Sequence, residues 1–197
     1  MPAVKRSRKS AEERKAEIVE VAIRLAGEHG PDRVTTQMIA DQIGITQPGI
    51  FRHFPAKTDI WLAVGEWIAS APNEGAARLA DTADPGARIR AMIAGYFAGI
   101  ARHPAIPAIL FSHELHAENH ALKAHFQRVM AYRRKGFAQL IQLAQDAGQV
   151  SNAVAADDVA ALILSLIQGL AMRWSLESRA FDLEAEGTRL LDQMLKM

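Results

Sequence analysis

The sequence predicts an all-α protein of two domains and about nine helices. Apolar residues recur at intervals of three and four along nearly every segment, which is the period of a helix with one buried face. No segment alternates apolar and polar residues as a half-buried strand does. Hydrophobic residues make up 49% of the chain and charged residues 23%, a composition typical of a globular protein that buries a core.

Capping residues place the helices of the N-terminal part. Ser10 and Glu13 form a predicted capping box, in which each side chain accepts the other residue's backbone N–H. Thr35 and Thr46 stand where N-caps are expected, and Gly44 between them divides the segment into two short helices. The predicted helices cover residues 11–28, 36–43, 47–54 and 57–70.

The C-terminal part follows a turn-rich stretch at residues 71–86, which we interpret as a linker. Asp84, Asp157 and Asp182 are predicted N-caps, and Gly148 is a predicted helix stop. The predicted helices cover residues 85–102, 105–115, 118–147, 157–177 and 183–195.

The two short helices around Gly44 have the pattern of a helix-turn-helix. Ala40 is small enough to let two helices cross closely, and apolar residues fall where such helices must touch. The second helix of such a unit can enter the major groove of DNA, which is about 12 Å wide. A helical hairpin inside some other all-α protein is the alternative. The predicted contact residues are Ile39, Ala40, Ile43, Ile45 and Ile50.

Over residues 12–67 the sequence resembles the TetR family of transcriptional regulators. The resemblance rests on Ile39-Ala40, Gly44, the run Thr46-Gln-Pro-Gly-Ile-Phe-Arg-His-Phe54 and Lys57. It implies a ligand-responsive, sequence-specific DNA-binding regulator, a repressor that a small-molecule effector releases from a palindromic operator. It also implies a cytoplasmic homodimer that is not an enzyme and has no cofactor.

The expected organisation has three parts. A basic disordered arm covers residues 1–9, a helix-turn-helix DNA-binding domain covers 10–56, and an effector-binding and dimerisation domain covers 57–197. The arm either follows the minor groove or the DNA backbone, or is a solvated tail. Its basic residues, with no acid among them, are Lys5, Arg6, Arg8 and Lys9.

The resemblance also implies which residues face DNA. The amides of Gln37 and Gln47 suit base edges, and the side chains of His53 and Lys57 suit phosphates. The family most often has Tyr where this chain has Phe51, so the hydroxyl that would bond a phosphate is missing and apolar contact remains. The predicted set is Thr36, Gln37, Thr46, Gln47, Pro48, Gly49, Phe51, His53 and Lys57.

The helix expected at residues 157–177 is apolar on nearly every side, which indicates burial on more than one face. One face then packs within its own subunit, and the resemblance implies that the other joins the last helix in a four-helix interface with a second subunit. A helix central to a monomer is the alternative. The predicted dimerisation residues are Ile163, Leu166, Ile167, Leu170, Trp174, Leu191 and Met194.

The helices between residues 85 and 147 carry the apolar side chains expected to form a sensor core. Some of these side chains would line a pocket for the effector, with a few polar groups to orient it. The predicted lining residues are Tyr96, Ile100, Phe111, His113, Phe126 and Met130.

A cluster of histidines offers an alternative function. His113 and His116 share one helical face, and imidazole with a nearby carboxylate would suit zinc, nickel or iron. The alternative is therefore a metal-responsive regulator or an all-α metal-binding protein. No spacing matches a closed tetrahedral site, so we expect scattered histidines and no metal. The histidines of this segment are His103, His113, His116, His120 and His125.

What the chain lacks narrows the classes further. It has no cysteine, which excludes disulfides, thiolate metal sites and cysteine nucleophiles. Its basic N-terminus has no apolar stretch behind it, unlike a secretory signal. The longest nearly apolar run, residues 159–172, is shorter than the roughly 20 residues of a membrane span. We therefore expect a soluble cytoplasmic protein with no membrane partner.

Overall fold

The computed structural model describes residues 9–70 and 84–195. These ranges hold ten α-helices, one 3₁₀ helix and no β-strand, which confirms the all-α class; about nine helices were predicted. The elements are α1 (Ala11–His29), η1 (Pro31–Arg33), α2 (Thr36–Ile43), α3 (Gln47–Phe51), α4 (Lys57–Ser70), α6 (Pro85–Arg102), α7 (Ala105–Leu110), α8 (His113–Glu118), α9 (His120–Asp146), α10 (Ala156–Leu176) and α11 (Leu183–Met194).

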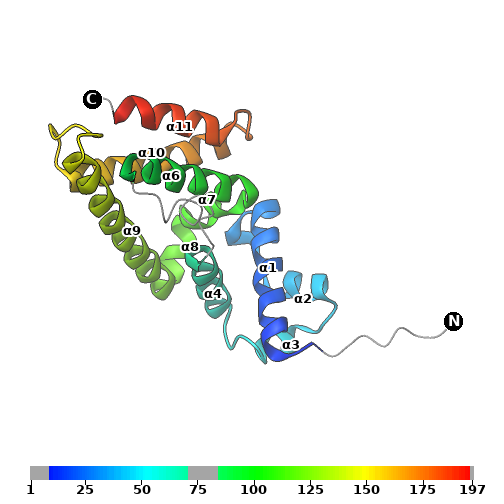
Figure 1. The fold of residues 1–197 in the computed structure, drawn as a ribbon. Helices are drawn as coiled ribbons and strands as arrows, with labels where there is room; N and C mark the ends of the chain where they lie inside the picture. The colour runs from blue at the N-terminus through cyan, green and yellow to red at the C-terminus, as the bar shows by residue number, and fades with distance from the viewer. Residues whose placement is uncertain (1–8, 71–83, 196–197) are drawn as a thin grey trace.

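The helices form two groups that the long helix α9 joins (Figure 1). α1 to α4 make one end of the molecule, with α2 and α3 on its outer side. α10 and α11 lie at the opposite end beside α6, and α7 and α8 fill the region between the two groups. α9 contacts both α4 and α10, so it spans from one group to the other.

Several predicted caps are present. The Ser10 hydroxyl accepts the N–H of Glu13 at 3.2 Å, and the Glu13 carboxylate accepts the N–H of Ser10 at 2.7 Å, which completes the capping box. Thr35, Asp84 and Asp182 also accept N–H groups from the turns that follow them. All of these bonds join residues close in sequence, which is why the sequence predicts them.

The helix expected at residues 105–115 is two helices, α7 and α8. Ser112 separates them and accepts the N–H of Leu115 at 3.0 Å, so it caps α8. The same hydroxyl donates to the carboxylate of Asp32 at 2.6 Å, 80 residues earlier in the chain. A partner so distant in sequence leaves no trace in the helical period.

Two predicted caps do not form. The Thr46 hydroxyl accepts no N–H from α3, and α3 ends at Phe51, earlier than the predicted residue 54. α10 begins at Ala156 after a residue without a capping side chain, so Asp157 lies inside the first turn. Its carboxylate there faces the positive end of the helix dipole, which is favourable without a capping bond.

The first hydrophobic core joins α1 to α4 with helices of the C-terminal part. Trp61 of α4 lies in it together with Ile109 of α7 and with Leu122 and Phe126 of α9. The core therefore continues across the expected domain boundary after residue 56. α4 contacts both α1 and α9 and forms the wall that the two parts share.

The second hydrophobic core lies between α6, the C-terminal half of α9, α10 and α11. Phe97 of α6, Ile141 of α9 and Ile163 of α10 are almost fully buried in it. α11 approaches α6 so closely at Gly187 that a Cβ atom there would overlap the ring of Phe97. Since only glycine fits, this contact fixes how α11 lies on α6.

α10 is long and apolar enough to cross a membrane by composition alone. It has 21 residues, and its most apolar window has a mean hydropathy of 1.6. The prediction that the apolar run is too short for a span is therefore wrong, because the helix extends beyond residues 159–172. Its inward side chains, including Ile163, Ile167 and Leu170, form part of the second core.

Candidate functional site

α2 and α3 cross around a tight turn. Gly44 adopts φ 75° and ψ 40°, in the left-handed region that favours glycine. The N–H groups of Gly44 and Ile45 both bond the carbonyl of Ala40, at 2.9 and 3.1 Å. Ala40 and Ile50 are fully buried, and Ile50 is the single buried residue of α3. The predicted helix-turn-helix is therefore present, and the rest of α3 is available to a partner.

α3 carries four of the nine residues predicted to face DNA, and Thr46 directly precedes it. Phe51 is 41% exposed although it is a large aromatic side chain, so it is free for the apolar contact predicted for it. Gln37 is exposed, and its amide donates to the carboxylate of Asp41 at 2.6 Å. Exposed or half-buried near this surface are Thr46, Gln47, Pro48, Gly49, His53 and Lys57.

Thr36 is the exception among the predicted contacts. It is only 7% exposed, and its hydroxyl accepts a hydrogen bond from the Gln47 amide at 2.8 Å. In this structure the Thr36 hydroxyl is therefore engaged with Gln47 and not exposed like the other predicted contacts. The amide oxygen of Gln47 keeps its capacity to accept a hydrogen bond.

The start of α4 is better capped than the sequence suggests. The carboxylate of Asp59 accepts the N–H of Ala56 at 2.9 Å, which is the half of a capping box that does not depend on the side chain of residue 56. Lys57 is the first residue of α4, so its charge lies beside the positive end of that helix, where anions bind favourably.

Asn119 is a residue that the sequence analysis missed. It is 4% exposed, its amide donates to the carbonyl of Thr58 at 2.8 Å, and its side-chain oxygen caps α9 by accepting the N–H of Leu122 at 3.0 Å. It therefore ties the beginning of α4 to the beginning of α9. A polar residue before a helical period is the signal of a cap, but the bond to Thr58 depends on the tertiary fold.

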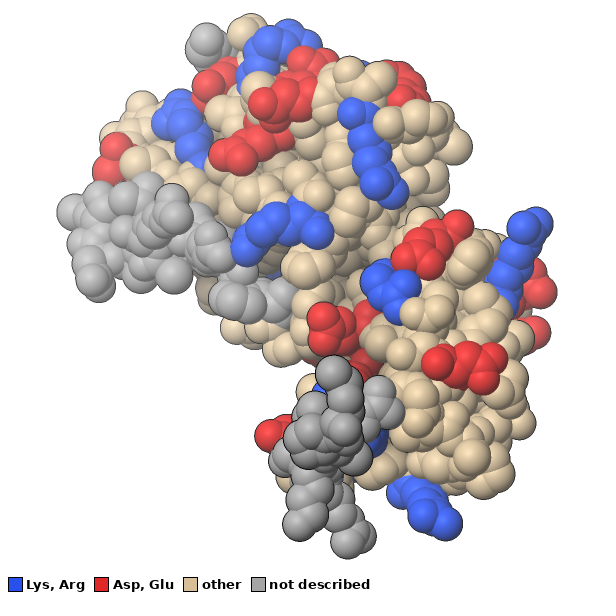
Figure 2. Space-filling model, turned by 90° about the vertical axis from the view of Figure 1, so that its right-hand side faces the viewer, with Lys and Arg blue, Asp and Glu red and all other residues tan. Residues whose placement is uncertain are grey.

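The basic arm lies almost entirely outside the described residues, which leaves Lys5, Arg6 and Arg8 without a structural account. Lys9 is described, and its ammonium pairs with the carboxylate of Glu17 on α1 at 2.8 Å. On the face shown in Figure 2, basic and acidic side chains are interspersed over the described part of the surface, with no broad patch of one sign.

Two neighbouring cavities lie on either side of Phe126 and Met130. The α8–α9 cavity has a volume of about 610 Å³ and is bounded by α7, α8, α9 and Gln168 of α10. The α6–α9 cavity, of about 80 Å³, lies between α4, α6, α7 and α9. All six predicted pocket residues border one of them: Phe111 and His113 the first, Tyr96 and Ile100 the second, Phe126 and Met130 both.

The histidines of residues 103–125 do not converge. His116 Nε2 lies 2.9 Å from the carbonyl of Leu110, while His113 is exposed. His103 packs edge-on against Trp67, away from both. Within residues 9–70 and 84–195, no group of three or more His, Cys, Asp or Glu side chains is arranged to hold a metal ion. The metal-binding alternative has no support.

The predicted dimerisation residues need correction. The fold buries five of them within their own subunit, where they cannot also form a subunit contact, and leaves Leu166 and Met194 half-buried. The face that α10 presents outward carries other apolar residues, namely Leu162, Met172 and Leu176, and Leu176 is 77% exposed. The five residues of the second core are Ile163, Ile167, Leu170, Trp174 and Leu191.

The exposed helix-turn-helix in front of a helical domain with cavities defines a helix-turn-helix regulator of transcription. Residues 18–64 match the family described as "Bacterial regulatory proteins, tetR family", and residues 85–197 match "BetI-type transcriptional repressor, C-terminal". The chain therefore belongs to the TetR family, with a C-terminal part of the BetI type. It is a ligand-responsive DNA-binding repressor, in a family of regulators and not of enzymes.

Individual relatives agree with this family. A protein of Escherichia coli (strain K12) named "Probable acrEF/envCD operon repressor" is 27% identical over 98% of this chain and 90% of its own length. The fatty acid degradation regulator FadR from Bacillus halodurans shares the fold with a TM-score of 0.80, at 16% identity over 96% of this chain and 97% of that one. A Saccharomonospora viridis transcriptional regulator in complex with choline also has a TM-score of 0.80, at 21% identity over 94% and 96%.

Proposed function

We propose that two copies of this chain bind a palindromic operator in the cytoplasm, and that a small molecule in the α8–α9 cavity releases them. The observation that carries the proposal is α3, which buries one side chain and leaves its remaining surface open. Its N-terminal residues would meet base edges, with Gln47 oriented by Thr36. Lys57 and the start of α4 would hold a phosphate.

The proposed dimer contact is the outward face of α10, together with α11. Leu162, Met172 and Leu176 lie at helical spacing on that face, and Gly169 between them is exposed. A stripe of apolar residues beside a glycine lets a second helix approach closely and bury surface that water otherwise covers. In a dimer held this way, the helix-turn-helix of each subunit forms one reading head. The two reading heads would meet half-sites about one helical turn of DNA apart.

The proposed effector site is the α8–α9 cavity because of its size and its walls. About 610 Å³ falls within the range of roughly 300–1,000 Å³ typical of small-molecule sites. About 80 Å³ holds only a few water molecules, at roughly 30 Å³ each, so the α6–α9 cavity is too small in this conformation.

The proposed coupling runs through two polar bonds made by residues outside the lining of this cavity, at the starts of the helices α8 and α9 that form its walls. Ser112 joins α8 to Asp32, and Asn119 joins α9 to Thr58 at the start of α4. A ligand that favours a different position of α8 or the first turn of α9 would also move the first turn of α4. That shift would change the distance between the two reading heads, so ligand and operator would oppose each other's binding.

The test is selection of bound duplexes from a random pool, followed by anisotropy with the selected operator. We expect a palindromic sequence, and we expect Gln47→Ala to weaken binding about tenfold to a hundredfold, because one base contact contributes about 1–3 kcal/mol. Gln139→Ala, an equal truncation at an exposed position of α9, serves as the control. Enrichment of no sequence, or equal effects of both variants, would contradict the proposal.

A further inference from the structure

The α8–α9 cavity has a positively charged residue in its lining and no negatively charged one. Lys123 is the single fully charged residue of its lining, which contains no Asp and no Glu. The ammonium of Lys123 forms no ion pair with any described residue. A positive ligand would therefore find no counter-charge in this cavity and would be repelled by Lys123.

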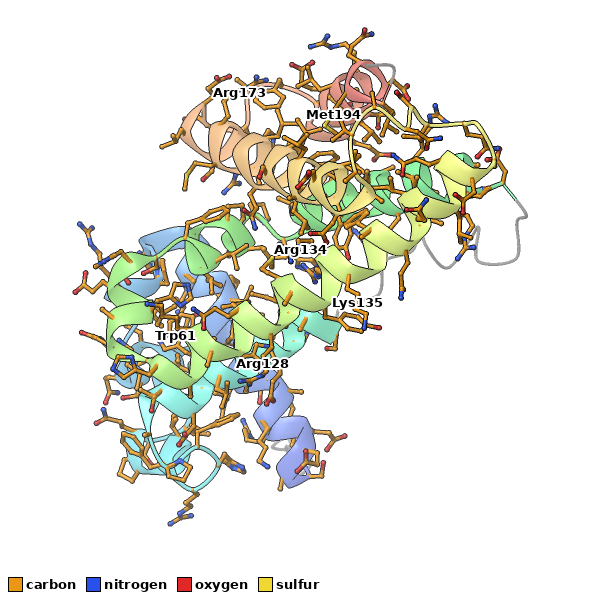
Figure 3. The ribbon with its side chains drawn as sticks, turned by 90° about the vertical axis from the view of Figure 1, so that its left-hand side faces the viewer. Trp61, Arg128, Arg134, Lys135, Arg173 and Met194 are labelled. Atoms are coloured by element: carbon orange, nitrogen blue, oxygen red, sulfur yellow. The ribbon has the colours of Figure 1, made fainter. Side chains whose placement is uncertain are left out.

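Basic residues gather on the α9 side of this region, whereas α8 carries the exposed acids Glu114 and Glu118. Arg133 is the charged residue that borders the α6–α9 cavity, and Arg128 and Arg133 border a third cavity beside Tyr132. All three cavities are lined in part by α9. This helix contains five Lys and Arg residues and one acidic residue, Asp146, in its last turn. Figure 3 shows this helix from its outer side, with Arg128, Arg134 and Lys135 along it.

Tyr96, which borders the α6–α9 cavity and not the α8–α9 cavity, already has a cation over its ring. The guanidinium carbon of Arg133 lies 4.9 Å above the ring of Tyr96, so the face of that ring already binds a cation. Burial raises the pKa of Tyr96 above its ordinary value, against the opposing effect of Arg133, so its phenol stays neutral. The ring of Tyr96 therefore offers no site for a second positive charge in the α6–α9 cavity.

Hydrogen-bonding groups of the α8–α9 cavity lack good partners. The amide of Gln168 donates to the Met130 sulfur at 3.5 Å, and a thioether is a weak acceptor. His116 uses Nε2 toward the Leu110 carbonyl, which can only accept, so Nε2 carries the hydrogen. Its Nδ1 is buried without a partner among the described residues. With the hydrogen on Nε2, Nδ1 is an acceptor, so it would pair with a hydroxyl or N–H of a ligand and not with its carboxylate.

We infer that the effector is an organic anion: a carboxylate carried on an apolar chain or ring. This inference rests on the proposed function of the cavity as the effector site. The carboxylate binds near Lys123, and the apolar body lies against Phe111, Phe126 and Met130. The assignment is opposite in charge to choline, the ligand of the Saccharomonospora viridis relative.

Calorimetry on the full-length protein without DNA tests the inference. The probes are decanoate and naphthalene-2-carboxylate as anions and decyltrimethylammonium as the cation, each below its micelle-forming concentration. We expect at least one of the two anions to bind and the cation not to bind. Tighter binding of the cation, or failure of both anions at millimolar concentration, would overturn the inference.

Two variants with the same change of charge locate the anion. Lys123→Gln should weaken binding of the carboxylate about tenfold, because a hydrogen bond to a charged group is lost. Lys135→Gln, on the same helix and outside the cavity lining, should leave the affinity unchanged. Equal affinities of the Lys123→Gln variant and the parent protein would overturn the placement and with it the inference.

Failure of the proposed function is seen separately. Operator binding is followed by anisotropy with and without the bound anion. If the carboxylate binds at Lys123 and operator affinity does not fall, the cavity is an anion site without the proposed regulatory role. If decyltrimethylammonium releases the operator and the carboxylates do not, the regulatory role stands and the anion inference is wrong.

Discussion

The first core and the α8–α9 cavity meet at Phe126, yet they differ in how completely their polar groups are paired. Around the first core, each buried polar side chain has a specific partner, as Thr36 has Gln47, Ser112 has Asp32 and Asn119 has Thr58. Beside the cavities, a ring nitrogen of His116 and one of His125 have no partner among the described residues. The polar side chains of the first core are thus paired within the subunit, whereas in the proposed function a ligand would supply partners beside the cavities.

The largest expected effect compares how tightly side chains pack in the first core and beside the α8–α9 cavity. Trp61→Ala should lower the free energy of unfolding by about 3–5 kcal/mol, because the side chain is buried in the first core. Phe111→Ala should cost only about 1 kcal/mol, because that ring already borders a cavity and is half-exposed. Urea denaturation measures both values, and equal losses would show that the cavity wall is packed as tightly as the core.

The second effect concerns the bond between α4 and α9. Asn119→Asp keeps an oxygen to cap α9 but loses the donor to the Thr58 carbonyl, so we expect a loss of about 1–3 kcal/mol in stability. We also expect the effector to lower operator affinity less than it does in the parent protein. Asn152→Asp, in an exposed loop, is the matched control. Unchanged regulation in the Asn119 variant would remove this bond from the coupling.

The third effect concerns phosphate contact at the start of α4. In the proposed dimer, Lys57→Gln removes one phosphate contact from each subunit. The slope of log affinity against log salt should therefore become less steep by about 2 in all. Anisotropy titrations over a series of salt concentrations give the slope. A slope equal to that of the parent protein would exclude Lys57 from the contacts.

The smallest effect tests the exposed aromatic residue of α3. Phe51→Tyr adds the hydroxyl usual in the family at a side chain that is already solvent-accessible, so operator binding should tighten about threefold to tenfold. Stability should not change. Phe111→Tyr adds the same hydroxyl far from α3 and should leave operator affinity as it was, and an equal gain in both variants would contradict the contact.

The elements that could be predicted from the sequence are those fixed by neighbouring residues. α4 begins and ends at the predicted residues, and the Ser10–Glu13 box and the Asp182 cap form as expected. The turn at Gly44 was also predictable, because its positive φ favours glycine. Each of these depends on a span of about one helical turn, so tertiary context does not alter it.

The features that could not be predicted depend on residues distant in sequence. Ser112, the N-cap of α8, bonds Asp32, and Asn119 bonds Thr58 across the first core. In α10 nearly every position is apolar, so the pattern does not show which side faces the second core. The sequence therefore indicated the helix of the proposed interface but not its outward face. The predicted contact residues include Ile163 and Leu170, whereas the proposed interface contains Leu162 and Leu176.

The bond from Thr36 to Gln47 has an evolutionary consequence. Because the Gln47 amide is held by the Thr36 hydroxyl, a substitution at residue 36 would change how this amide is oriented without altering Gln47 itself. In the proposed complex, operator preference therefore depends on residues of both α2 and α3. Drift at a position that never meets the nucleic acid could redirect such a repressor toward new promoters.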